Sequence, residues 1–316
     1  MKETNFDIIY IVESGFQQKI VDHLIEQIYP NKNYLIIKKS GDGFQLGNQS
    51  WQAVDFNHGK GILKSFGTVY RFPKLSCDKL IGTHFTGVNC RFFEAVIKYK
   101  KLELIDDGIG TPVILNKTNF YFDQPFSLLK FFILRILLLS VFLKTKSTKK
   151  IIKNVSLYHS VYFKDYQGLK VNYLDYFKRW ASEINTGKIG FIGQPFVEYG
   201  FIKEKVMIEI LIQIISENKG MLDYFPDPSE KWIYDQTISN LNVVLKDKPL
   251  EQYFKENGTP EMLYTFVSSA LLNIKMISPA TKGFYIKVPN QEKYRKPYYA
   301  LFEKVGAKEY KYDFNK

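Results

Sequence analysis

The sequence predicts an α/β protein with two parallel-sheet domains, and three observations support this prediction. The chain has 316 residues, which is more than most single domains contain and suits two domains of about 150 residues each. Hydrophobic residues make up 45% of the chain and charged residues 24%, a composition typical of globular proteins. Short apolar runs alternate with segments of helical periodicity, the order that builds parallel sheets with crossover helices.

The first elements follow this alternation. Residues 6–12 are apolar and rich in β-branched side chains, which predicts a buried strand. A helix over about 16–29 and a second strand at 34–38 come next. Another helix at about 89–99 leads into a strand that ends at Asp106.

The rest of the chain continues the pattern. Helices are predicted at 201–217 and 291–304. We expect two α/β units that are joined near residues 165–187, with domains of residues 1–175 and 176–316. The further predicted strands lie at 155–161, 188–192, 220–225, 241–245, 262–267 and 283–288.

Two adjacent carboxylates, Asp106 and Asp107, follow the end of a predicted strand, and Gly108 follows them. Loops at the carboxyl ends of strands in open α/β sheets face the crevice that ligands occupy, so one carboxylate is a candidate general base. The alternative is turn chemistry alone, because Asp bonds its own backbone and Gly accepts a positive φ. The motif by itself leaves both interpretations open.

Net charge and cysteine content narrow the classes of partner. The formal charge of +12 indicates an anionic partner such as nucleic acid, an acidic lipid surface or a phosphorylated substrate. No zinc-ligand spacing, RNP-like aromatic motif or DNA-reading helix accompanies the basic residues, so we expect no nucleic-acid partner. Cys77 and Cys90, the two cysteines, fit packing residues in a reducing compartment. The amino terminus lacks the features of a signal peptide, and we expect a cytoplasmic protein.

Residues 126–143 form an apolar stretch, and a lysine-rich run follows to residue 153. A membrane span is disfavoured, because Lys130 and Arg135 would each cost about 2.5–3.5 kcal/mol inside the bilayer. A helix lying in the membrane interface suits the sequence better, and a buried core helix is the alternative. The residues expected to contact an anionic membrane surface are Lys130, Arg135, Lys144, Lys146, Lys149 and Lys150.

Three segments of the second half predict a ligand site. Residues 189–195 read as a strand and a tight turn of the sort that begins a nucleotide-binding domain, and residues 222–230 as a strand that enters a proline-bracketed loop. Residues 262–272 place Ser268 and Ser269 between a strand and a helix. Hydroxyls and free N–H groups at a helix amino terminus bind phosphate, although a plain serine N-cap is the alternative.

With these segments in order, the chain resembles the bacterial sialyltransferases of the lipooligosaccharide sialyltransferase family, with kinship to capsular polysialyltransferases. Members share an acidic-acidic-Gly motif in the first domain, a His-Pro motif in the second and a Ser-Ser or Ser-Thr pair farther on. Asp106-Asp107-Gly108 matches the first motif and Ser268-Ser269 the third. The resemblance extends over residues about 100–275.

One position departs from the family pattern. The family reads Pro-His-Pro followed by a basic residue and Glu, whereas this chain has Pro226-Asp227-Pro228-Ser229-Glu230. An aspartate repels a phosphate unless it is protonated or paired with a cation. We therefore expect that Ser268, Ser269, backbone amides and lysines hold the donor, or that the donor differs, or that the chain is impaired.

The resemblance implies a GT-B architecture, in which two Rossmann-like domains face an interdomain cleft, and an inverting glycosyltransferase activity. It implies a CMP-linked nonulosonic acid such as sialic acid as donor, with no metal or other cofactor. The implied acceptor is a hydroxyl of a capsule or lipooligosaccharide glycan, including lipid-linked forms at the inner face of the cell membrane. Asp107 is assigned as the base and Asp106 as its orienting neighbour. The residues assigned to the donor site are Gly108, Gly193, Pro226, Asp227, Pro228, Glu230, Ser268 and Ser269.

Two other functions remain open at the level of the sequence. Asp227 favours a GT-B transferase that uses a Kdo-like or other nucleotide-activated sugar. A membrane-peripheral protein that binds glycan or nucleotide without transfer is the alternative that is not an enzyme. His84 and His159 could approach the site from strand ends, but we expect both to be structural residues.

Overall fold

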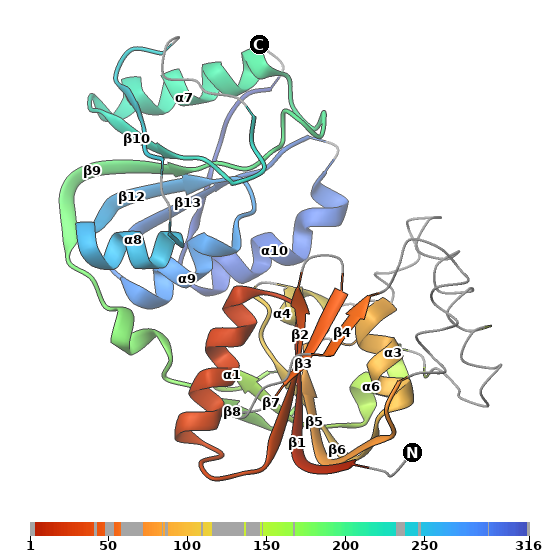
Figure 1. Cartoon of the computed structure of the whole chain (residues 1–316). Helices are drawn as coiled ribbons and strands as arrows, with labels where there is room; N and C mark the ends of the chain where they lie inside the picture. Colours follow the sequence, from red (N-terminus) through yellow and green to blue (C-terminus); the bar gives the residue numbers. More distant parts are fainter. Residues whose placement is uncertain are drawn as a thin grey trace. The chain divides into compact units, whose positions relative to one another are not determined.

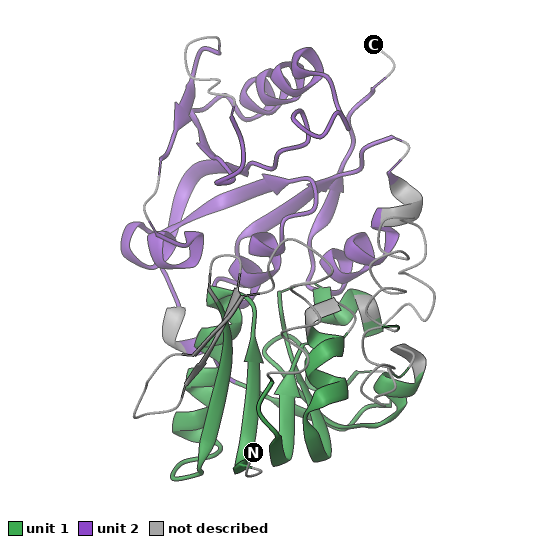
Figure 2. Cartoon of the chain, turned by 45° about the vertical axis from the view of Figure 1, so that its right-hand side comes forward, with its two compact units in different colours: residues 1–174 green, residues 175–316 purple. Residues whose placement is uncertain are grey.

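The computed structural model of the chain contains two compact units, residues 1–174 and residues 175–316 (Figure 2). Each unit has its own sheet. The residues that the structure describes are 4–40, 43–47, 54–57, 72–83, 85, 88–108, 110–115, 136, 146, 148–166, 168–231, 238–245, 248–289 and 291–314.

The first unit is built on an eight-stranded sheet with the order β4-β3-β2-β1-β5-β6-β7-β8 (Figure 1). The six strands β2, β1, β5, β6, β7 and β8 pair in parallel with their neighbours. Strands β3 and β4 extend the sheet beyond β2 as an antiparallel edge. Their bounds are β1 (Thr4–Val12), β2 (Tyr34–Ser40), β3 (Gly43–Gly47), β4 (Val54–Asn57), β5 (Leu75–Gly82), β6 (Lys98–Ile105), β7 (Val155–Ser160) and β8 (Val171–Tyr173).

Helices cover both faces of this sheet. In Figure 1, α1 (Gly15–Gln27) lies on one face, and α3 (Val88–Val96) and α6 (Thr148–Lys153) lie on the other. Ser14 caps α1, because its Oγ accepts a hydrogen bond from the Gln17 amide at 3.2 Å. The buried apolar side chains of α1, which hold it on the sheet, are Ile20, Val21 and Leu24. The short helix α4 (Gly110–Leu115) follows β6.

The second unit is a six-stranded parallel sheet with the order β11-β10-β9-β12-β13-β14. Its bounds are β9 (Ile184–Ile192), β10 (Leu222–Phe225), β11 (Leu241–Val243), β12 (Thr259–Thr265), β13 (Lys282–Ile286) and β14 (Lys308–Tyr310). The chain moves outward from β9 to β11 on one side and from β12 to β14 on the other. The order therefore reverses between β9 and β12, and such a switch point opens a crevice for ligands at the carboxyl ends of the strands.

The helices of the second unit divide between the two faces of its sheet. Helix α7 (Glu204–Asn218) covers one face, and α8 (Leu250–Asn257), α9 (Ser269–Ile277) and α10 (Glu292–Lys304) cover the other (Figure 1). A short 3-10 helix, η1 (Phe177–Trp180), precedes β9. This division follows from right-handed crossovers that run in opposite directions from the switch point.

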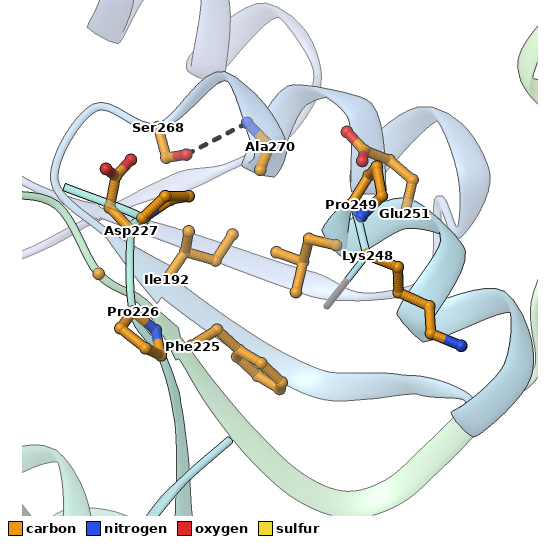
Figure 3. Close-up of a pocket in the computed structure, with 12 residues that line it drawn as sticks. Ile192, Phe225, Pro226, Asp227, Lys248, Pro249, Glu251, Ser268 and Ala270 are labelled. Atoms are coloured by element: carbon orange, nitrogen blue, oxygen red, sulfur yellow. Dashed lines mark hydrogen bonds between the residues drawn. The ribbon is translucent and has the colours of Figure 1, made fainter. Parts of the chain in front are cut away.

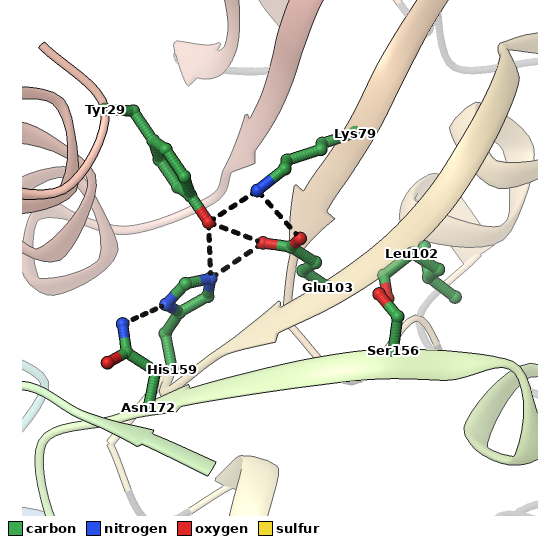
Figure 4. A network of polar contacts seen from close by, with 7 residues as sticks. All are labelled: Tyr29, Lys79, Leu102, Glu103, Ser156, His159 and Asn172. Atoms are coloured by element: carbon green, nitrogen blue, oxygen red, sulfur yellow. Dashed lines mark hydrogen bonds and ion pairs between the residues drawn. The ribbon is translucent and has the colours of Figure 1, made fainter. Parts of the chain in front are cut away.

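A polar network crosses the core of the first unit (Figure 4). The carboxylate of Glu103 lies 2.8 Å from His159 Nε2, 3.0 Å from the Tyr29 hydroxyl and 3.2 Å from Lys79 Nζ. Asn172 Nδ2 lies 3.0 Å from His159 Nδ1. Burial would raise the pKa of Glu103, but the hydrogen bond and charge of His159, together with Lys79, lower it. His159 is therefore a structural residue that joins β5, β6 and β7, as predicted.

The structure corrects the predicted elements at several points. The helix predicted at 89–99 is too long, because α3 ends at Val96 and β6 begins at Lys98 to pair with β5. Strand β5 has no counterpart in the prediction, since Asp78 and Lys79 interrupt its apolar run. Pairing with β1 and β6 on its two sides makes this segment a central strand. The antiparallel pair of β3 and β4 has no predicted counterpart either.

The stretch predicted to associate with a membrane lies largely outside the described residues. Of residues 126–143, the structure describes Ile136 alone. Among the residues that are described, no helix is long and apolar enough to cross a membrane.

Candidate active site

Three neighbouring strands of the first unit end in polar residues at one edge of the sheet. Glu13 follows β1, Thr83 follows β5, and Asp106 follows β6. The strands β1, β5 and β6 are adjacent and parallel, so their carboxyl ends meet at the same edge. This edge carries the acidic pair that the sequence singles out.

Asp106 is fully buried and joins the ends of two strands. Its Oδ2 accepts hydrogen bonds from Ser160 Oγ at 2.9 Å and from the Val161 amide at 2.7 Å, and its Oδ1 accepts one from the Tyr158 hydroxyl. Burial raises the pKa of Asp106 to about 7, although the three donors lower it, and the charge of Asp107 adds to the rise. The side chain of Asp106 therefore ties the end of β6, from which the chain continues into Asp107, to the end of β7.

Asp107 lies just before α4 and is partly exposed. Its Oδ1 accepts hydrogen bonds from the Thr111 amide at 2.5 Å and the Thr111 hydroxyl at 3.2 Å. Gly108 has a φ of 80°, and a Cβ at Gly110 would lie 2.6 Å from Asp107 Oδ1. Both glycines are therefore required for this turn. The turn chemistry that the sequence offers as the alternative to a general base is therefore present at Asp107.

Two residues near Asp107 were not singled out as site residues from the sequence. The Cys90 thiol, fully buried on α3, donates a hydrogen bond to Glu13 Oε2 at 3.4 Å. Burial raises the pKa of this thiol well above its usual value, and the charges of Glu13 and Asp107 act in the same direction. The thiol is therefore an unreactive packing group, as predicted. Glu13 directly follows β1, just as Asp106 directly follows β6. This shared position at the end of a strand is the sequence signal that could have identified Glu13 as a site residue.

A pocket of about 410 Å³ opens in the second unit (Figure 3). Its walls come from the ends of β9 and β10, the segment before α8 and the amino terminus of α9. Five predicted donor-site residues line it together: Gly193, Pro226, Asp227, Pro228 and Ser268. The pocket thus lies beside the switch point of the sheet, where ligands of such folds bind.

The amino terminus of α9 forms one wall of this pocket. Ser268 is the N-cap of α9, and its Oγ accepts a hydrogen bond from the Ala270 amide at 3.3 Å. Gln194 Oε1 accepts a hydrogen bond from the Val267 amide at 2.6 Å, which ties this loop to the end of β9. Ser269 is the first residue of α9 and is not among the lining residues. The dipole of α9 makes this wall favourable for an anion.

Asp227 and Glu230 have different places in the loop that follows β10. Asp227 lines the pocket, and its Oδ1 accepts hydrogen bonds from the Ser229 amide at 2.9 Å and hydroxyl at 2.5 Å. Glu230 lies beneath the loop, where its carboxylate accepts hydrogen bonds from the Tyr224 hydroxyl and the Asp227 amide, each at 2.7 Å. Asp227 therefore lines the pocket, whereas Glu230 supports the loop.

Two charged residues of the pocket carry no sequence signal. Lys248 lies 2.5 Å from Glu256 Oε2, and Glu251 Oε1 accepts a hydrogen bond from Asn273 Nδ2 at 2.5 Å. Figure 3 shows Lys248 and Glu251 on one side of the pocket and Asp227 with Ser268 on the other. Only the packing of α8 beside α9 brings them to the same cavity.

The other residues of interest lie elsewhere. Lys146 forms an ion pair with the buried carboxylate of Glu94 at 2.6 Å. Lys149 and Lys150 belong to α6, whereas Lys130, Arg135, Lys144 and His84 lie outside the described residues. Among the described residues, no group of three His, Cys, Asp or Glu side chains is arranged to hold a metal ion.

Comparison with known proteins places these features in one family. The sequence model of glycosyltransferase family 52 matches residues 84–289, a range that includes Asp106-Asp107-Gly108, the loop 226–230 and Ser268-Ser269. A search of curated proteins finds no significant match.

The solved structures that are similar to this chain over most of its length include two enzymes. An alpha/beta-galactoside alpha-2,3-sialyltransferase from the luminous marine bacterium Photobacterium phosphoreum has a TM-score of 0.50 at 14% identity, over 96% of this chain and 96% of that chain. The UDP-GlcNAc 2-epimerase of Methanocaldococcus jannaschii, in complex with UDP-GlcNAc and UDP, has a TM-score of 0.45 at 9% identity, over 97% of this chain and 88% of that chain. The first likeness confirms the predicted GT-B fold class with its Rossmann-like units.

Asp106→Asn is expected to gain stability relative to the wild type as the pH rises from 4 to 8. The pKa of Asp106 is about 7 in the folded protein and near 3.8 in a free side chain, so the folded protein binds this proton more tightly than the unfolded chain does. The stability that protonated Asp106 gives at low pH is therefore lost as the pH rises through about 7. A neutral amide side chain at this position has no such loss. Urea unfolding at each pH measures the effect, and a difference that is independent of pH would contradict it.

Proposed function

The chain belongs to glycosyltransferase family 52, a bacterial sialyltransferase family, and on this basis we propose that it transfers a nonulosonic acid such as sialic acid from a CMP-activated donor. The acceptor in this proposal is a hydroxyl group of a capsule or lipooligosaccharide glycan, and the reaction inverts the anomeric configuration. The pocket beside the switch point of the second unit carries the proposal. Gly193 and Asp227 line it together with Ser268, which stands at the amino terminus of α9.

The pocket suits a nucleoside monophosphate in three respects. The amides at the start of α9 and the Ser268 hydroxyl favour the phosphate of the donor. Glu251 is a carboxylate within the pocket, and carboxylates accept hydrogen bonds from ribose-type hydroxyls. Ile192, Phe225 and Leu250 add an apolar surface for a base. In this proposal the donor phosphate needs no metal.

The proposed base is Asp107. It takes the proton from the acceptor hydroxyl while the hydroxyl oxygen bonds to the anomeric carbon, and the bond from that carbon to the phosphate oxygen breaks. The CMP leaves with the electron pair of this bond, and attack from the opposite face inverts the configuration. Asp106 positions Asp107, because it is held by three donors from β7 and the residue that follows it.

Asp227 supports a second candidate function. It stands where the family has a histidine, and its carboxylate lines the pocket. A negative side chain opposes a bare phosphate but accepts hydrogen bonds from hydroxyls. A transferase with a Kdo-like or other nucleotide-activated sugar as donor is therefore the alternative, and where that sugar is carried on a nucleoside diphosphate, nucleotide preference separates the two candidates.

Asp107→Asn is expected to lower the rate of transfer roughly 10²–10⁴-fold, the usual effect of losing a general base. The Asn side chain still accepts the Thr111 hydrogen bonds, so the turn is retained while the basic carboxylate is lost. The assay follows CMP release from CMP-sialic acid with lactose as the β-galactoside acceptor. CMP affinity should not change. Asp78→Asn, at an exposed position of the same sheet, is the control, and retention of more than a few per cent of activity in Asp107→Asn would exclude this base.

CMP is expected to raise the melting temperature of the protein more than UDP or GDP, because the proposed donor is a CMP sugar. A ligand at roughly one hundred times its Kd adds about 2.7 kcal/mol to the free energy of unfolding.

Ser268→Gly should weaken CMP binding about tenfold or more, because the hydrogen bond from the Ser268 hydroxyl to the charged phosphate is lost. Glycine is tolerated at an N-cap, so α9 is retained. A shift with diphosphate nucleotides alone would support the second candidate.

The proposed location is the inner face of the cell membrane, with residues 126–153 as the segment that binds anionic lipid. The wild-type chain is expected to float with vesicles that contain phosphatidylglycerol and to remain behind with neutral phosphatidylcholine vesicles. Replacement of Lys144, Lys149 and Lys150 by Gln should reduce flotation. Lys146 is left unchanged because it pairs with Glu94. Absence of the wild-type chain from the floated fraction would refute the membrane proposal.

A further inference from the structure

Carboxyl groups are concentrated behind one wall of the nucleotide pocket. Asp227 lines the pocket directly. Glu230 lies beneath the same loop, and Glu198, which follows β9, accepts a hydrogen bond from the Lys231 amide at 2.7 Å. An anionic ligand in the pocket therefore meets negative charge from this side.

The Glu230 carboxyl is held in a fixed position by groups from two elements. Its Oε1 accepts from the Tyr224 hydroxyl of β10 and its Oε2 from the Asp227 amide, each at 2.7 Å. The Glu230 amide donates back to the Asp227 carbonyl at 3.0 Å. These reciprocal hydrogen bonds close the loop over the carboxyl group.

Gly193 brings the same carboxyl group close to the pocket. A Cβ at residue 193 would overlap Glu230 Oε2 and would lie 2.6 Å from the Tyr224 hydroxyl. Glycine is therefore required here for a close approach of backbone and carboxyl. Gly193 and Asp227 both line the pocket and both lie against Glu230, so the carboxyl group lies directly behind backbone that lines the pocket.

The surroundings of Glu230 place its pKa near neutral pH. Burial raises the pKa of Glu230 to about 7, the Tyr224 hydroxyl and Asp227 amide lower it, and the charges of Glu198 and Asp227 raise it. An anion bound in the pocket adds negative charge and raises this pKa further. By linkage, a proton is then taken up when the anion binds.

We propose that Glu230 takes up a proton when the pocket binds an anionic nucleotide, and that this proton offsets the carboxylate that Asp227 adds to the pocket wall. The protonated group fits the observed geometry, because Oε1–H donates to the Tyr224 oxygen while Oε2 continues to accept from the Asp227 amide. The loop therefore keeps its shape. This inference rests on the proposed function only in taking a nucleotide as the anion.

Calorimetric titration tests the proposal on the full chain. The ligand is the methyl ester of CMP, since its phosphodiester does not titrate near neutrality, unlike the phosphate of CMP. At pH 7, titrations in PIPES and in Tris give the number of protons bound per ligand. The wild type is expected to take up a fraction of a proton. For an upward pKa shift of one unit, it should bind about sevenfold more tightly at pH 6 than at pH 8.5.

Glu230→Gln is expected to abolish proton uptake and to flatten the pH profile, while it keeps both hydrogen bonds of the loop. The control Glu198→Gln, at the neighbouring carboxyl group, should retain proton uptake. Binding by the wild type without proton uptake, or the same uptake in Glu230→Gln, would overturn the proposal and leave the nucleotide site intact. Absence of binding by the wild type would overturn the nucleotide site as well.

Discussion

Asp106 joins the carboxyl ends of β6 and β7, because its buried carboxyl group accepts hydrogen bonds from Tyr158, Ser160 and the Val161 amide. The next residue, Asp107, is thereby carried to the same edge of the sheet as Glu13 and Thr83. Loss of these hydrogen bonds would leave polar groups buried without partners, at about 1–3 kcal/mol for each group. The position of the candidate base thus depends on a side chain that is closed to substrate.

The second unit repeats this arrangement with different residues. Glu230 accepts a hydrogen bond from the Asp227 amide, and Asp106 directly precedes Asp107 in the chain, so each of these carboxyl groups adjoins an aspartate of its own unit. Burial raises the pKa of each supporting carboxyl group to about 7. Both units therefore place an acid of near-neutral pKa behind an aspartate, a distribution typical of functional sites.

Net charge is a poor guide to the pocket itself. The chain carries a formal charge of +12, yet the pocket presents the carboxylates of Asp227 and Glu251, and Lys248 is paired with Glu256 at 2.5 Å. Attraction for an anion must then come from the amides and dipole at the start of α9. Lys248 is the one lysine among the described residues that line this pocket, so the excess of lysine lies outside it.

The sequence by itself determined the fold class, the family and most strands, since these depend on local patterns such as the apolar run at 6–12 and on motifs such as Asp106-Asp107-Gly108. The family resemblance also assigned Gly193, Asp227 and Ser268 to one donor site, and all three line the same pocket. Only the tertiary structure decided that β5 is a central strand, that Glu103 pairs with His159, and that Glu251 enters the pocket. These features depend on contacts between residues far apart in the chain, and no local pattern encodes which distant partner will satisfy a buried charge.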